Sequence, residues 1–129
     1  MAPEHSRRQD EAELIRLINC ALLKSKVQLI IAHNLSGTEE VHHVELAMFH
    51  AVQALEAAAL SHHTELEAKA EMFRGHCYRK LEKWADAHRS YIRAAALPSF
   101  AADKGPEGLE SLTRECIRKN LTSTKHPVL

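Results

Sequence analysis

Apolar residues recur every three or four positions along this chain, in five segments separated by short polar breaks. No segment of useful length alternates with the period of two that is typical of a half-buried strand. The pattern therefore predicts an all-α fold of about five helices, over residues 11–35, 38–61, 65–81, 84–97 and 107–121. The 129 residues fit one domain. We expect a single helical domain over residues 11–121, with flexible ends at residues 1–10 and 122–129.

The polar breaks carry signals for helix ends. Gly37 can end the first helix, and Ser36 with Glu39 has the spacing of a capping box for the second. Thr64 and Glu67 repeat that spacing before the third helix. A proline after the fourth helix, Pro98, stops it.

The first helical segment has an unusually wide apolar arc. Apolar side chains over residues 11–35 surround much of the helix, more than one hairpin partner can cover. An exposed apolar stripe usually meets another chain, so we expect a homo-oligomer formed through this helix.

Two successive helices share a ladder of small and large residues: Gly75, Tyr78, Trp84, Ala87, Tyr91 and Ala94. A glycine inside a helix costs about 1 kcal/mol relative to alanine, so we expect a neighbouring helix to approach Gly75 closely. Ala87 would be the small partner on that helix. The three aromatic residues would fill the space on either side of the contact.

This ladder resembles the signature of the tetratricopeptide repeat (TPR), a helix–turn–helix unit, over residues 68–98. The chain departs from that signature at four positions. Glu71, Arg74 and Glu82 stand where the repeat prefers Trp, Leu and Gly, and Pro98 falls one residue early. The ladder is also absent one repeat length earlier in the chain. The resemblance implies antiparallel helical hairpins that stack side by side, with the two preceding helices as a degenerate neighbour.

The resemblance also implies a function, since TPR-like arrays bind other proteins in a groove lined by the first helix of each hairpin. The groove positions fall here on Lys69, Met72, His76, Arg79 and Lys80. Four of these five residues are basic or can become so, which favours an acidic peptide or helix as the partner. Phe73 stands where carboxylate-binding members have an arginine, so we do not expect capture of a C-terminal carboxylate.

Other interpretations remain open. The Ala-rich stretch "HAVQALEAAAL" is similar to microtubule-interacting-and-trafficking modules, which bind an amphipathic helix. The ladder can also arise by chance in an ordinary or self-assembling helical bundle. A third class is a catalytic or metal-dependent helical protein that uses the ten histidines. Five of those histidines lie in residues 36–63 with four Glu and no Asp, Lys or Arg, so an acidic second helix could pair with the basic groove of another copy.

Composition and motifs narrow the function class. The formal net charge is zero, which does not favour nucleic acid or an anionic membrane as a partner. We find no motif for a catalytic site, a metal site or a cofactor, and we expect a non-enzyme. The three cysteines form no CxxC pair, and we expect all three to be buried thiols in a reducing compartment. With no signal peptide apparent, we expect an intracellular protein, cytoplasmic or nuclear.

Overall fold

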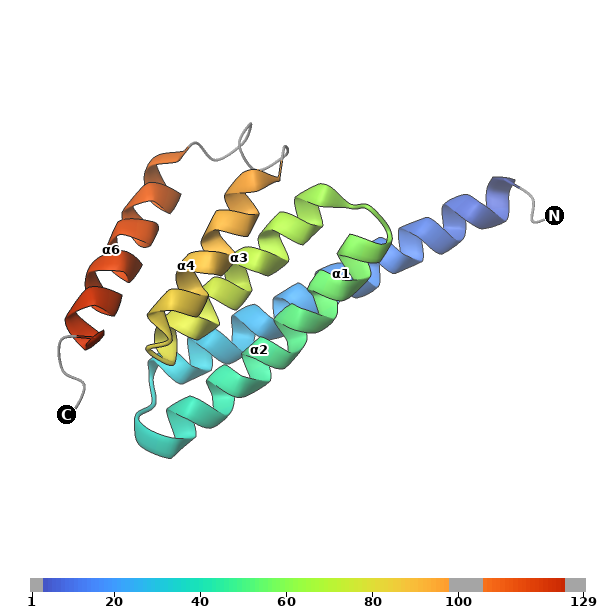
Figure 1. Cartoon of the computed structure of the whole chain (residues 1–129). Helices are drawn as coiled ribbons and strands as arrows, with labels where there is room; N and C mark the ends of the chain where they lie inside the picture. Colours follow the sequence, from blue (N-terminus) through green and yellow to red (C-terminus); the bar gives the residue numbers. More distant parts are fainter. Residues whose placement is uncertain (1–3, 98–105, 125–129) are drawn as a thin grey trace.

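The computed structural model describes residues 4–97 and 106–124, which form five helices and no strand (Figure 1). The expectation of an all-α fold built from antiparallel hairpins is confirmed. The helices are α1 (Glu4–His33), α2 (Gly37–Leu60), α3 (Thr64–Lys80), α4 (Trp84–Ala96) and α6 (Pro106–Thr124).

The helices form a row in chain order. Each of α1 to α4 packs against the next described helix, and α1 also contacts α3 (Figure 1). The α1–α2 hairpin thus stacks against the α3–α4 hairpin, and α6 packs on α4 at the far end of the row. The contact between α1 and α3 brings the first helix of each hairpin to the same face of the row.

Small residues hold the first hairpin together. The buried side of α2 consists of Val44 and four alanines, which recur every three or four residues: Ala47, Ala51, Ala54 and Ala58. Alanine side chains let neighbouring backbones come close. The buried Ser25 of α1 therefore reaches the backbone of α2, where its hydroxyl donates a 2.8 Å hydrogen bond to the Ala47 carbonyl.

The second hairpin closes on a glycine and a tyrosine. A Cβ atom built on Gly75 would lie only 2.6 Å from Cε1 and 2.8 Å from Cδ1 of the Tyr91 ring. The glycine of α3 therefore makes room for the Tyr91 ring, whereas the sequence pointed to Ala87 as its small partner. Ala87 and Tyr91 are instead buried together with Cys116 of α6, and Tyr78 and Trp84 pack against this cluster.

A buried ion pair occupies the α3 position at which the repeat signature prefers tryptophan. Glu71 is only 6% exposed, and its Oε1 lies 2.8 Å from Nη2 of Arg74. Burial raises the pKa of the Glu71 carboxyl, and the charge and hydrogen bonds of Arg74 oppose that rise. The two residues that depart from the TPR signature here thus compensate each other.

Both ends of the helical domain extend beyond the sequence prediction. Residues 4–10 belong to α1 and are not a flexible lead-in, because no glycine or proline interrupts residues 4–33 and an existing helix is extended at little cost. At the other end α6 continues to Thr124, past the expected limit at residue 121. The rest of the expected flexible ends, residues 1–3 and 125–129, and the expected stop at Pro98 lie outside the described residues.

The two expected capping boxes are absent. Ser36 is the N-cap of α2, but its side chain makes no capping hydrogen bond, and the N-cap of α3 is His63, not Thr64. Gly37 does not end α1, which stops at His33. It begins α2 with φ +65°, a backbone conformation that glycine adopts without strain.

The next two turns share one geometry, which the sequence does not reveal. His62 and Glu82 both have positive φ, at 59° and 60°. In each turn the following amide donates back to the carbonyl five residues earlier, from His63 to Ala58 at 3.0 Å and from Lys83 to Tyr78 at 2.9 Å. This pattern is typical of a helix C-terminus that ends in a residue with positive φ, a position where glycine is the usual residue.

Candidate protein-binding groove

A groove runs along the face where α1 and α3 lie side by side. Its central hollow has a volume of about 540 Å³ and is lined by Asn19, Leu22, Leu23, Lys26, Lys69, Met72, Phe73 and His76. A second hollow of about 300 Å³ shares Lys26 and Phe73 with it, and a third of about 550 Å³ shares Asn19 and Lys69. Because neighbouring hollows share lining residues, they form one continuous groove from Ile15 of α1 to Asn34, just after the end of that helix.

The walls of the groove are largely apolar. Leu22 and Leu23 of α1 face Met72 and Phe73 of α3 across the central hollow. Leu23 and, further along, Ile30 are 59% and 56% exposed, so both leave substantial apolar area open to solvent. A partner that covered these side chains would gain the free energy of burying them.

Three lysines give the groove its charge. Lys26 lies on the α1 side, and Lys69 and Lys80 lie on the α3 side. Among the described residues that line the groove, Glu65 supplies the one carboxylate, 4.0 Å from Lys69 in an exposed contact that contributes little. Lys80 Nζ lies 3.4 Å from Nδ1 of His33. The groove is therefore a mainly basic channel with apolar walls.

His76 connects the wall of the groove to α4. Its Nδ1 and the Tyr91 hydroxyl share a 2.7 Å hydrogen bond, and its ring meets the Phe73 ring edge to face. Burial, aided by the nearby Arg79 charge, lowers the pKa of His76 to about 4. His76 is thus neutral at pH 7 and adds no positive charge to the groove. From the sequence alone, it counts among the residues that are basic or can become so.

Four of the five residues expected to line a groove do so: Lys69, Met72, His76 and Lys80. The fifth, Arg79, turns toward α6, where its Nη1 lies 3.4 Å from Oε2 of Glu115. The first helix was also expected to line the groove, as the first helix of its hairpin, but none of its lining residues was predicted. The wide apolar arc of the first helix was the signal for these residues, but that arc does not show which side of α1 faces α3.

Among the six ladder residues, Gly75 of α3 lies against Tyr91 of α4, while Tyr78 and Trp84 pack against the cluster of Ala87, Tyr91 and Cys116. Gly75, Ala87, Tyr91 and Ala94 are buried, while Tyr78 and Trp84 are half-buried. The contacts of Gly75 and Tyr78 with α4 hold α3, and with it the groove wall, against α4.

The thiols differ from the expectation that all three are buried. Cys77 and Cys116 are buried, but Cys20 is exposed on α1. Burial raises the pKa of Cys77 to about 12, so its thiol stays protonated and unreactive at neutral pH.

Residues 4–97 and 106–124 contain no cluster of three potential metal ligands. None of the helices in this part of the chain has the length and apolarity needed to cross a membrane.

No protein-family model, curated protein or solved structure matches this chain.

Proposed function

We propose that this protein is a small TPR-like adaptor, a protein-interaction module that holds a segment of another protein in the groove between α1 and α3. The observation that carries the proposal is the groove itself. It combines exposed apolar side chains with three lysines and almost no carboxylate. These features favour an acidic partner segment with an apolar side.

The stacking order of the helices supports this proposal. The ladder on α3 and α4 resembles one TPR hairpin, and α1 with α2 stacks beside it as a neighbour. Two buried thiols that form no disulfide suit a reducing compartment, so we place the adaptor in the cytoplasm or nucleus.

Charge reversal in the groove tests the proposal. The variant Lys69→Glu/Lys80→Glu reverses two lysines that line the groove. The matched variant Lys24→Glu/Lys83→Glu makes the same charge change at exposed lysines outside its lining. We expect a protein captured by the wild type to bind the groove variant with an affinity at least about tenfold lower. Its affinity for the matched variant should equal that for the wild type. Isothermal titration calorimetry with the purified partner measures the difference.

A second pair of variants tests the apolar wall. Leu23 and Leu17 of α1 are almost equally exposed, at 59% and 61%, but Leu23 lines the groove and Leu17 does not. Leu23→Asp is expected to abolish binding, whereas Leu17→Asp is expected to leave it intact. Equal binding by all four variants would overturn the proposed function.

A further inference from the structure

The outer face of α2 carries a pattern that matches the groove. Glu45, Phe49, Val52 and Glu56 occur at i, i+4, i+7 and i+11, on one face of the helix. Phe49 is 62% exposed, and both carboxylates are exposed. Residues 37–60 contain four Glu and no Asp, Lys or Arg. This face is therefore acidic, with an apolar centre.

The α3 wall of the groove shows the same spacing with the opposite charge. Lys69 and Lys80 are also eleven residues apart, and Met72, Phe73 and His76 lie between them. Eleven residues of helix span about 16 Å in just over three turns, so the two lysines and the two glutamates lie at equal separations on their helices. Because this spacing is the same in both directions along a helix, the glutamates of α2 can match the lysines of α3 in a parallel or an antiparallel arrangement.

The acidic face and the groove lie on different sides of one chain. The opposite side of α2 is buried through Val44, Ala51 and Ala58, where it packs against α1 and α3. A chain therefore cannot place its own α2 face in its own groove. Another copy of the chain can supply it.

We propose, on the basis of the proposed binding groove, that its occupant is a second copy of this chain, whose α2 face lies along the α1–α3 groove. Glu45 and Glu56 of that copy pair with Lys69 and Lys80. Phe49 enters between Leu23 and Phe73. A helix is suited to this role because its backbone hydrogen bonds are already satisfied, and only side chains need partners.

The contact is heterologous, since two different surfaces meet: one copy keeps its α2 face free and the other keeps its groove free. Such contacts close into rings, of which a reciprocal pair is the smallest, or continue into open filaments. The wild type should therefore exceed the 14.5 kDa mass of one chain as its concentration rises. Because the contact depends on charge, raising the salt concentration should weaken it.

Sedimentation of two charge-reversed variants tests the proposal. In Lys69→Glu/Lys80→Glu the groove meets an α2 face of the same charge, and in Glu45→Lys/Glu56→Lys the α2 face meets a groove of the same charge. Each variant alone should sediment as a monomer. An equimolar mixture restores opposite charges at every contact and should associate as the wild type does. The matched variant Lys24→Glu/Lys83→Glu should associate like the wild type.

The proposal is overturned if the wild type remains monomeric at every concentration, or if the mixture behaves as two monomers. A monomeric wild type whose groove still binds a different protein, with Lys69 and Lys80 required, would overturn this inference and leave the proposed function standing. A wild type that neither self-associates nor binds a different protein would overturn both this inference and the proposed function.

Discussion

Gly75 shows how one residue sets the distance between two helices. An alanine there would gain about 1 kcal/mol of helix propensity, but its Cβ would lie 2.6 Å from a fully buried tyrosine ring. The ring cannot move easily, because Tyr91 also shares a hydrogen bond with His76. Overpacking of this kind costs about 1–3 kcal/mol, so the steric effect exceeds the gain in propensity.

We therefore expect Gly75→Ala to lower the free energy of unfolding in urea denaturation by about 1–2 kcal/mol. The double variant Gly75→Ala/Tyr91→Leu provides the control. With the ring removed, the alanine should no longer destabilise the protein relative to Tyr91→Leu alone. A single variant as stable as the wild type would show that the ring does not require a glycine.

His76 should make the stability of the protein depend on pH. Its pKa is about 4 in the folded protein and near 6.5 when exposed, so below pH 6.5 the unfolded chain binds more protons than the folded one. The stabilisation is complete above pH 6.5 and is lost as the pH falls from 6.5 toward 4. Between pH 7 and pH 5 the loss amounts to about 1–2 kcal/mol.

Comparison with His76→Gln isolates this effect, because glutamine can keep a hydrogen bond to the Tyr91 hydroxyl but does not titrate. Glu71 acts in the opposite direction through its raised pKa, and its contribution is the same in both proteins. Urea denaturation at pH 7 and pH 5 should show a smaller loss of stability for His76→Gln than for the wild type. Equal losses in the two proteins would contradict this assignment.

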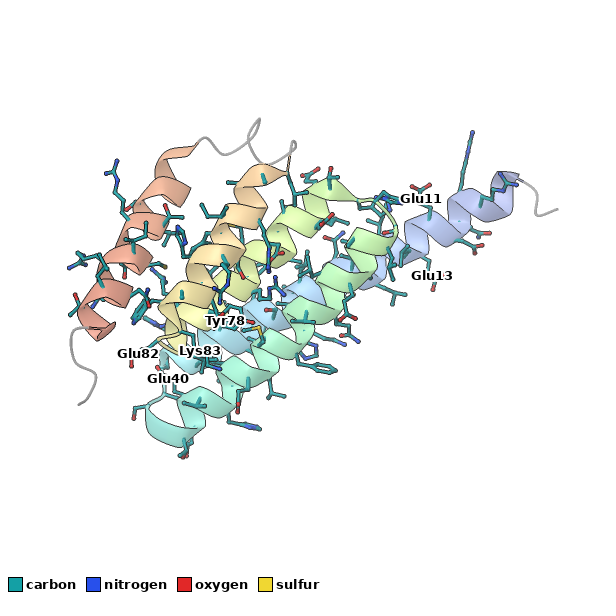
Figure 2. All side chains as sticks on the ribbon, viewed as in Figure 1. Glu11, Glu13, Glu40, Tyr78, Glu82 and Lys83 are labelled. Carbon is teal, nitrogen blue, oxygen red and sulfur yellow. The ribbon has the colours of Figure 1, made fainter. Side chains whose placement is uncertain are left out.

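Among the helices, the sequence predicts best what depends on local periodicity. The limits of α2, α3 and α4 fall within one residue of the expected ones, because each helix buries a narrow stripe such as Val44, Ala51 and Ala58 of α2. The part of α1 before residue 11 was missed because residues 7–10 are exposed, so no apolar stripe marks them as helical. Figure 2 shows Glu11 and Glu13 on this end of α1, which extends past the α2–α3 turn.

The candidate groove was only half predictable. Its α3 wall follows from the ladder that Gly75 begins, since that ladder fixes which side of α3 meets α4. Its α1 wall depends on residues some fifty positions apart, such as Lys26 and Phe73, lining the same hollow, which no local pattern specifies. The loss of charge on His76 also follows from burial between helices and cannot be seen in the sequence.

The whole molecule is an open row of helices, so its stability should differ from the middle to the ends. α3 contacts α1, α2 and α4, whereas α6 packs mainly on α4. Residues 7–13 of α1 have exposed side chains throughout, and local unfolding begins where few buried contacts hold a segment.

We expect hydrogen exchange at low protein concentration to be slowest in α2 and α3. It should be faster in α6 and fastest in residues 7–13 of α1. Uniform protection across the helices would contradict this gradient, because it would mean that the row unfolds as one unit. If copies associate as inferred, raising the concentration should slow exchange in the parts of α1 and α3 that line the groove and on the outer face of α2. Residues 7–13 lie outside both surfaces and should not change, so they provide an internal control within the same sample.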